Sequence, residues 1–347
     1  MSDILKIIDL QINFKTSQGM IYALRGVNFT LQKGEIFAIC GESGSGKSIT
    51  SKAIAGLLPF NAIVKKGEIL YENQDLTKIT DKDFNQIRGR KITMIFQNPM
   101  TSLNPLMKAG KQIEEVFQIK AKRDKKNYSK TEFKKQTIQL MKEMGIDEAD
   151  NKYHLYPHQL SGGICQRIVI AIALANESEI LICDEPTTAL DPIVQKQILE
   201  LIKKITKERQ LSVIFITHDL GVIASIADRA AVMYAGKIVE IGQINEIFYN
   251  AHHPYTWALL QSMPNLNTKE ENLNFIEGQP PVLTFIPQGD AFAPRNPYAL
   301  KIDFEKKPPM FPISASHFAA TWLLHPSAPK YEAPAFIQSL RRKGGFI

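Results

Sequence analysis

The stretch Gly41-Glu-Ser-Gly-Ser-Gly-Lys-Ser48 decides the fold of this chain. It matches the pattern GxxxxGKS in full and follows the apolar run 35–40, which predicts a short buried strand. After it, apolar residues recur at helical spacing until Pro59, and this predicts a helix. The apolar stripe of this helix comprises Ile49, Ala53, Ile54, Leu57 and Leu58. Strand, glycine loop and helix in this order are typical of a phosphate-binding loop.

The residues of this loop have chemical roles that follow from their types. Glycines let the backbone curl so that successive N–H groups face phosphate oxygens, and the new helix adds the positive end of its dipole. Lys47 would reach the β- and γ-phosphates, while the hydroxyl of Ser48 would ligate Mg²⁺. A glycine-rich turn with a chance lysine is the alternative. The predicted nucleotide contacts are Gly41, Ser43, Gly44, Ser45, Gly46, Lys47, Ser48 and Ile49.

Two further apolar runs end in residues suited to phosphate chemistry. The run 179–183 leads into Asp184 and Glu185, of which the first could hold Mg²⁺ and the second could orient or deprotonate a water. The run 212–217 leads into His218, at a place where open parallel sheets bind ligands. Taken alone, a solvated strand end and a structural histidine explain these positions at least as simply.

Length and composition narrow the class of protein. The chain has 347 residues, 44% hydrophobic and 22% charged, which argues against disorder as its main state. Its three cysteines are too few for a disulfide framework, and no CxxC pair suggests a zinc or redox motif. No window reaches the roughly 18 apolar residues that a spanning helix needs, so we expect the chain neither to cross a membrane nor to be secreted. An amphipathic segment at 193–205 lies between two of the strands, and this alternation predicts a parallel, helix-covered sheet.

The net charge of +7 is largely concentrated in one short patch. Residues 120–135 contain eight basic side chains against Asp124 and Glu132. A solvated surface is the first interpretation, and attraction to anionic lipid head groups is the second. Nucleic acid binding is disfavoured because only Tyr128 and Phe133 alternate with the basic residues.

The segment Leu160-Ser-Gly-Gly-Ile-Cys-Gln-Arg167 resembles the signature of ATP-binding cassette (ABC) proteins. It stands between the phosphate loop and Asp184, and the other cassette motifs accompany it in the family's order. Gln97 resembles the Q-loop glutamine, residues 188–191 resemble the D-loop, and His218 resembles the switch histidine. The resemblance implies that ATP is the nucleotide and that two cassettes meet head to tail. A Ser-Gly-Gly helix cap is the alternative for the signature segment alone.

The same resemblance implies a catalytic set. Glu185 would prepare the attacking water and His218 would hold it against the γ-phosphate, while Lys47 and Gln97 complete the set. The implied Mg²⁺ ligands are Ser48, Gln97 and Asp184.

An aromatic ring stacks on adenine in this family, and Phe14 falls at the corresponding place. Its alternative is a core phenylalanine in an N-terminal strand, and Tyr22 is the second choice for the stacking ring. The signature residues would approach the γ-phosphate of the ATP that the partner subunit binds. The further implied ATP contacts are Ser161, Gly162, Gly163 and Asp191.

A closer resemblance, to the ATPase subunits of bacterial dipeptide and oligopeptide importers, covers nearly the whole chain. It rests on the segments Phe96-Gln-Asn-Pro-Met-Thr-Ser-Leu-Asn-Pro105, Tyr156-Pro-His-Gln-Leu-Ser-Gly-Gly163 and His253-Pro-Tyr-Thr-Trp-Ala-Leu-Leu260. We therefore expect a motor that couples ATP hydrolysis to peptide import at the cytoplasmic face of the cell membrane. The implied partners are a second ABC ATPase subunit, with a heterodimer favoured, two transmembrane permease subunits and an extracellular peptide-binding protein. No nucleic acid partner is expected.

The resemblance also implies the architecture. We expect an α/β fold in which a P-loop core carries an antiparallel β subdomain, a helical insertion at about 97–174 and a C-terminal extension. The nucleotide-binding domain would span 1–250, and a proline-rich extension would span 251–347.

The chain departs from the family pattern at four positions of the extension and at one pair of residues in the signature. Many relatives hold an iron–sulfur cluster on four cysteines of the extension, where this chain has Asp290, Asn296, Asp303 and Thr321. Because such clusters need thiolates, we predict that this chain holds none. In the signature, Ile164-Cys165 stands where Met and Arg are common.

Three other functions remain open at this point. An importer of nickel or another small solute is the nearest rival. A soluble ABC ATPase acting on nucleic acid would usually show paired cassettes, heptad insertions or a zinc motif, and none is present. A non-catalytic cassette would lack central motif residues, and here none is missing.

Overall fold

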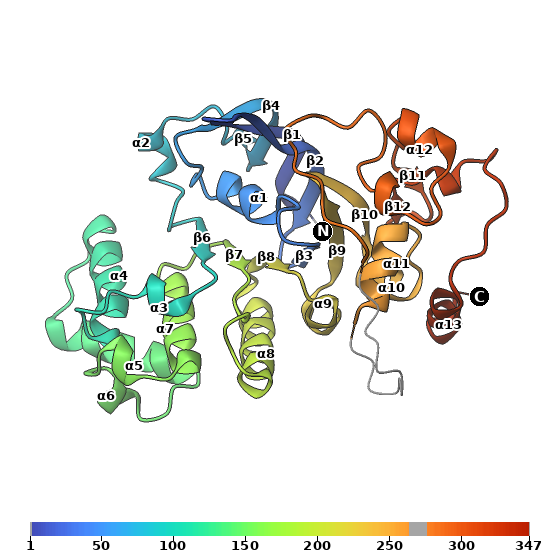
Figure 1. Cartoon of the computed structure of the whole chain (residues 1–347). Coiled ribbons are helices and arrows are strands. Elements are labelled where there is room, and N and C mark those ends of the chain that lie inside the picture. The colour runs from blue at the N-terminus through green and yellow to red at the C-terminus, as the bar shows by residue number, and fades with distance from the viewer. Residues whose placement is uncertain (1, 264–275, 347) are drawn as a thin grey trace. The chain divides into compact units, whose positions relative to one another are not determined.

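The computed structural model describes residues 2–263 and 276–346, which form two compact units (Figure 1). The first unit combines the two ends of the chain, Met1–Ile79 and Phe215–Ile347, and the second is Thr80–Ile214. The predicted division into 1–250 and 251–347 follows motifs rather than packing and stays a prediction. Residues 264–275 and 347 of the predicted extension lie outside the described residues.

An antiparallel sheet of the first unit has the strand order β2-β1-β4-β5. Its strands are β1 (Asp3–Thr16), β2 (Gly19–Gln32), β4 (Ala62–Tyr71) and β5 (Gln74–Asp75). In β1 the buried apolar residues are Leu5 and Ile7 and then Leu10 and Ile12, so the alternation changes phase once. Asp9 at this point has a φ of 43° and the register with β2 shifts, as in a β-bulge. The extra residue keeps all four apolar side chains on the buried face.

The second sheet of this unit contains strands in the order β11-β12-β10-β9-β3. β3 and β9 pair in parallel, whereas β9, β10, β12 and β11 pair antiparallel. All five residues of β3 are buried, as predicted for the strand before the phosphate loop. The strands are β3 (Ile36–Cys40), β9 (Arg229–Tyr234), β10 (Lys237–Gln243), β11 (Phe311–Pro312) and β12 (Phe318–Ala319). β8 (Ser212–Thr217) coincides with the predicted run and straddles the boundary between the units.

Helices and short 3₁₀ turns complete the first unit. They are α1 (Lys47–Ile54), α9 (Leu220–Ile226), α10 (Ile244–Tyr249), α11 (Pro254–Gln261), α12 (Lys301–Glu305), α13 (Ala335–Lys343), η2 (Ala293–Arg295) and η3 (Trp322–Leu324).

The prediction that the first helix runs to Pro59 is wrong. α1 ends at Ile54, because Gly56 adopts a left-handed φ of 64°. The amide of Leu57 then donates to the carbonyl of Lys52 at 2.7 Å, and the amide of Gly56 donates to that of Ala53 at 3.2 Å. This pair of bonds is a Schellman motif, which satisfies the last carbonyls of the helix and turns the chain away.

The second unit contains a parallel strand pair and a helical cluster. β6 (Ile92–Ile95) pairs with β7 (Ile180–Asp184), and α4 packs against α5 and α7. Its helices are α2 (Asp81–Phe84), α3 (Pro99–Ser102), α4 (Ala109–Arg123), α5 (Lys130–Glu143), α6 (Ala149–Lys152), α7 (Gly162–Ala175), α8 (Pro192–Arg209) and the turn η1 (Pro157–Gln159). The predicted helix at 193–205 therefore lies within α8. The basic patch of residues 120–135 joins the end of α4 to the start of α5. Within the described part of the chain, every helix is too short or too polar to span a bilayer.

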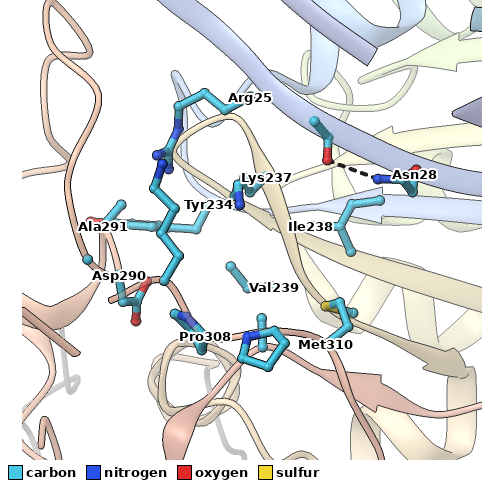
Figure 2. Close-up of a pocket in the computed structure, with 15 residues that line it drawn as sticks. Arg25, Asn28, Tyr234, Lys237, Ile238, Val239, Asp290, Ala291, Pro308 and Met310 are labelled. Carbon is cyan, nitrogen blue, oxygen red and sulfur yellow. Dashed lines mark hydrogen bonds between the residues drawn. The ribbon is translucent and has the colours of Figure 1, made fainter. Parts of the chain in front are cut away.

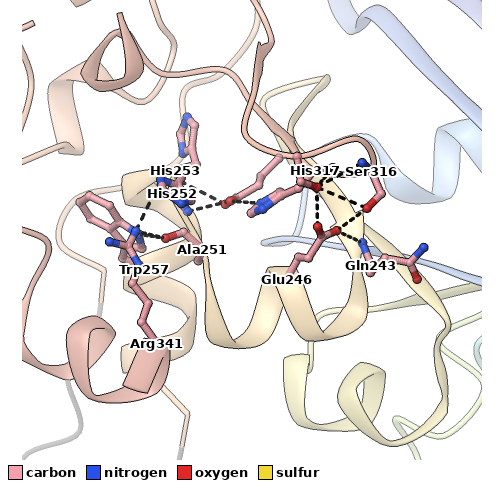
Figure 3. A network of polar contacts seen from close by, with 11 residues as sticks. Gln243, Glu246, Ala251, His252, His253, Trp257, Ser316, His317 and Arg341 are labelled. Atoms are coloured by element: carbon pink, nitrogen blue, oxygen red, sulfur yellow. Dashed lines mark hydrogen bonds and ion pairs between the residues drawn. The ribbon is translucent and has the colours of Figure 1, made fainter. Parts of the chain in front are cut away.

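A buried polar network fastens the extension to β10 (Figure 3). His317 and Glu240 are both fully buried, and their Nε2 and Oε1 atoms lie 2.8 Å apart. The carboxylate also accepts the amides of His252 and His253 at 2.7 and 3.1 Å. Burial opposes its ionisation, but these bonds outweigh that effect and leave the pKa of Glu240 below its ordinary value. The extension is therefore held by a charged contact inside the core.

Candidate nucleotide-binding and hydrolysis site

The phosphate loop follows β3 in the first unit, and its glycines are required by its shape. Gly41, Gly44 and Gly46 have φ values of 145°, 79° and 106°. A Cβ on Gly41 would lie 2.0 Å from the carbonyl oxygen of Met233, and one on Gly46 would lie 2.7 Å from Leu24. A Cβ on Gly44 would meet nothing within 4 Å, so the loop is open at this point. The loop therefore packs tightly against the protein at Gly41 and Gly46, whereas the space beside Gly44 is open to a ligand.

Two side chains of the loop fit a phosphate ligand. Lys47 is only 5% exposed, and its ammonium donates to the carbonyls of Gly41 and Glu42 at 2.7 and 2.8 Å. The hydroxyl of Ser45 is buried and has no hydrogen-bond partner within the described residues. A buried ammonium over a loop of N–H groups is suited to binding phosphate oxygens. The hydroxyl of Ser48, half-buried at the start of α1, is a suitable hard ligand for Mg²⁺.

The sequence did not reveal that the extension holds this loop at Glu42. Arg295 donates to both carboxylate oxygens of Glu42, at 2.7 and 2.9 Å, and to the hydroxyl of Tyr234 at 3.2 Å. These bonds raise the pKa of the Arg295 guanidinium, and the bonds to Glu42 contribute most. Tyr255 of α11 accepts the amide of Glu42 at 2.7 Å. A sequence signal existed for Tyr255, which lies in the segment 253–260 that carries the resemblance to importer ATPases.

The second unit brings together Gln97, Glu185 and Thr188. The amide nitrogen of Gln97 and the hydroxyl of Thr188 each donate to Oε2 of Glu185 at 3.1 Å. Asp184 is the last residue of β7 and is 7% exposed, whereas Glu185 is half-buried. A buried carboxylate followed by a more accessible one suits one metal ligand and one base. That Gln97 is also an Mg²⁺ ligand stays a prediction.

Glu185 has an uncommon backbone conformation. Its φ is 50°, in the left-handed region that residues with a Cβ rarely occupy. Such a conformation costs on the order of 1–3 kcal/mol and persists only where the surroundings enforce it. Pro186 and Thr187 directly after it are buried, which holds the turn in place. Strain at this residue supports a functional role for Glu185.

The signature segment begins a helix and also presents a surface. Ser161 caps α7, because its hydroxyl accepts the amide of Ile164 at 3.4 Å. Ser161 and Gly162 are exposed. A Cβ on Gly163 would lie 2.6 Å from the side chain of Val194, so glycine is required for packing against α8. The helix-cap alternative and exposure toward a second cassette are thus compatible.

Two other signature and D-loop positions have structural contacts. Asp191 caps α8 by accepting the amides of Ile193 and Val194 at 3.1 and 3.0 Å. Cys165 is fully buried, and its thiol donates to the carbonyl of Pro157 at 3.5 Å. Burial also raises the pKa of this thiol. The departure at residue 165 therefore points into the second unit, away from solvent.

The remaining predicted residues lie in the first unit. His218 is exposed directly after β8, and Asp219 next to it caps α9. Phe14 is half-buried in β1, opposite Ile21 of β2, and Tyr22 is half-buried in β2. Both interpretations of Phe14, adenine stacking and strand packing, fit this position.

The four positions of the extension that the resemblance aligns with cysteines of many relatives cap local turns here. Asp290 accepts the amide of Phe292 at 3.1 Å, and Asp303 accepts that of Leu300 at 2.7 Å. Asn296 and Thr321 make the corresponding bonds to residues 298 and 323, at 2.9 and 3.3 Å. All four side chains thus form local hydrogen-bonded turns, and the absence of a cluster stays a prediction.

Comparison with known protein families identifies the class. The model of the ABC transporter family matches residues 24–188, and that of the oligopeptide/dipeptide transporter C-terminal region matches residues 239–302. A dimeric ATP-binding cassette bound to ADP and Pi is 31% identical and superimposes with a TM-score of 0.62, covering 69% of this chain and 98% of its own. The chain belongs to the ATP-binding cassette family and is an ATPase, so the predicted fold and enzyme class are confirmed.

Full-length relatives identify the branch of the family. The oligopeptide transport ATP-binding protein OppD of Bacillus subtilis is 54% identical over 98% of this chain and 94% of its own length. The dipeptide transport ATP-binding protein DppD of Lactococcus lactis is 50% identical, with coverages of 94% and 93%. The predicted resemblance to this branch is confirmed.

Proposed function

We propose that this chain is the ATP-hydrolysing motor subunit of an importer for dipeptides or oligopeptides. The observation that carries the proposal is the match of residues 239–302 to the oligopeptide/dipeptide C-terminal region. A cassette alone is shared by transporters of many solutes, whereas this second region accompanies peptide transport in the names of its relatives. The extension is also docked on the phosphate loop through Arg295, so it is integral to the motor.

The phosphate loop performs the binding step. Its amides and Lys47 would hold the phosphates, and they would stabilise charge that develops on the transferred group. Ser48 and Asp184 provide oxygen ligands for Mg²⁺, which when bound neutralises charge on the phosphate oxygens. These are the residue types that such an ion prefers. Asp184 is the last residue of the buried strand β7, and Ser48 lies in the first turn of α1.

The segment after β7 performs the chemical step. Glu185 would orient the attacking water and take its proton, and the bonds from Gln97 and Thr188 fix the carboxylate for that task. His218 would hold the water against the γ-phosphate. Gln97 would also transmit the state of the site to the membrane subunits, since it lies next to Phe96, which is 44% exposed.

The working assembly would contain two cassettes. The exposed Ser161 and Gly162, with Gly163 and Asp191, would complete the ATP site of the other cassette, which we expect to be a second, different importer ATPase. Two transmembrane permease subunits would bind the pair at the cytoplasmic face of the cell membrane, and an extracellular binding protein would deliver peptide to the permease.

Affinity purification of this chain from membranes of its native host tests the proposal. We expect two multi-span proteins and a second cassette to co-purify. ATP hydrolysis by the reconstituted complex should then rise when its binding protein is loaded with peptide. Stimulation by nickel instead of peptide would change the substrate, and recovery of ribosomes or DNA without membrane subunits would reject the transporter.

A further inference from the structure

A second pocket in the first unit is lined by residues outside the phosphate loop. It has a volume of about 230 Å³ and is formed by β2, the start of β10 and the extension. Figure 2 shows Arg25 and Lys237 extending into this pocket, with Pro308 and Met310 across from Arg25. None of the residues predicted to bind ATP lines it.

The lining of this pocket has an excess of positive charge. Arg25, Lys237 and Lys307 line it together with a single carboxylate, that of Asp290, which leaves a net charge of about +2. The two lysines come from separate parts of the chain, β10 and the segment after α12, so the tertiary fold gathers the cations.

These cations are incompletely paired within the part of the chain that the structure describes. Nε of Arg25 donates to the carbonyl of Ala235 at 2.6 Å, but its Nη1 is buried and has no hydrogen-bond partner there. The ammonium groups of Lys237 and Lys307 make no hydrogen bond or salt bridge with any described residue. A buried donor without a partner is destabilising, and more so when it is charged. An anion in the pocket would remove that destabilisation.

The electrostatics of the pocket also favour the binding of an anion. Burial lowers the pKa of Arg25, and burial together with the nearby Arg25 and Lys307 lowers that of Lys237. Charge repulsion between these groups falls when an anion lies between them.

We propose that this pocket binds the dianionic phosphate group of a small phosphate monoester. A dianion matches the excess charge, and guanidinium and ammonium donors are the groups that bind phosphate in proteins. Apolar atoms of Val239, Pro308 and Met310 line the same pocket and would contact the rest of the molecule. The pocket is smaller than the roughly 300–1,000 Å³ of drug-sized sites, which limits the ligand to a small metabolite or a lipid head group.

A soluble probe tests the proposal on the full chain. The Lys47→Ala background weakens phosphate binding at the ATP site, so that equilibrium dialysis of phenyl phosphate reports on the second pocket. We expect Lys237→Gln and Lys307→Gln each to raise the dissociation constant about tenfold, because each removes one charge-assisted contact. Phenyl sulfate, which is a monoanion of similar shape, should bind more weakly than phenyl phosphate.

A matched control and a second arm separate the outcomes. Lys330→Gln removes an exposed lysine of the extension outside the pocket and should leave binding unchanged. Co-sedimentation with phosphatidylcholine vesicles, with and without phosphatidic acid, distinguishes a lipid head group from a free monoester. Binding that depends on Lys237 and Lys307 in either experiment supports the site. Such binding in dialysis identifies a free monoester as the ligand, and such binding to the phosphatidic acid vesicles identifies a lipid head group. Equal binding by all three lysine variants, or no binding in both arms, overturns the site.

Thermal unfolding with and without phenyl phosphate distinguishes a loss of binding from a loss of folding. Lys307 is exposed, so Lys307→Gln should melt close to the parent protein in the absence of ligand. Phenyl phosphate should raise the melting temperature of the parent and of Lys330→Gln, but less that of Lys307→Gln. An equal rise in all three would contradict the proposed site.

Discussion

The phosphate loop and the segment after β7 both follow a buried strand, yet they are supported differently. The loop is anchored by a distant part of the chain, since Arg295 and Tyr255 hold Glu42 from the extension. Glu185 is held by Thr188 three residues away and by the exposed side chain of Gln97. The phosphate loop, which is the binding half of the site, is therefore preformed by contacts from the extension, whereas Glu185, in the chemical half, has contacts with Thr188 and Gln97 of its own unit.

The largest effect should come from the chemical half. Glu185→Gln removes the carboxylate that we propose as the base but leaves the phosphate loop intact, so we expect turnover to fall by about 10²–10⁴-fold while ATP still binds. Phosphate release and ATP titration measure the two quantities. Glu208→Gln, an exposed substitution in α8, is the control. Turnover near that of the parent would place the base elsewhere.

The contact that fastens the extension should have the next largest effect. His317→Ala leaves the fully buried carboxylate of Glu240 without this side-chain partner, and removing the partner of a buried carboxylate costs about 3–5 kcal/mol. Denaturant unfolding of this variant and of the exposed His325→Ala measures the difference. If both lose the same small amount of stability, the network does not hold the extension.

Within the binding half, Lys47→Ala should weaken ATP binding about 100-fold, because a buried charge-assisted donor to phosphate is lost. Titration with a fluorescent ATP analogue measures the dissociation constant. An unchanged value would contradict the assigned role of Lys47.

Arg295→Ala tests directly whether the extension preforms the loop. We expect the KM for ATP to rise about tenfold with kcat nearly unchanged, since Glu42 is partly exposed and the ion pair is accordingly weakened by solvent. Arg342→Ala in α13 is an exposed control. Exchanging the charges in Glu42→Arg/Arg295→Glu should recover part of the affinity, and a fall in kcat alone would reject a positioning role.

The smallest effect concerns how stability depends on pH through His252, whose backbone amide donates to Glu240 in the buried network. Burial, with Arg341 nearby, lowers the pKa of His252 to about 4 from 6.5. Below pH 6.5 the unfolded chain takes up a proton that the folded protein does not, so stability should fall between pH 6.5 and about 4. His252→Gln should make the melting temperature less sensitive across this window. An unaltered pH profile would show that His252 is not responsible.

Local patterns were sufficient for the parts of the site that depend on neighbouring residues. The strand before Gly41, the adjacent Asp184 and Glu185, and the span of β8 follow from short apolar runs and from the chemistry of phosphate loops. The end of α1 was misjudged because Pro59 is a visible stop, whereas Gly56 ends the helix earlier through its left-handed φ of 64°. Apolar periodicity continued past the true end.

The family, the phosphate loop, the adjacent carboxylates Asp184 and Glu185 and the lack of cysteine in the extension could all be recognised from the amino-acid sequence. That Arg295 reaches Glu42, 253 positions away, and that Arg25, Lys237 and Lys307 share one pocket became visible only in the folded chain. The physical reason is that motif chemistry is encoded by residues adjacent in the chain. Contacts between distant residues depend on how strands and loops pack, and no local pattern specifies them.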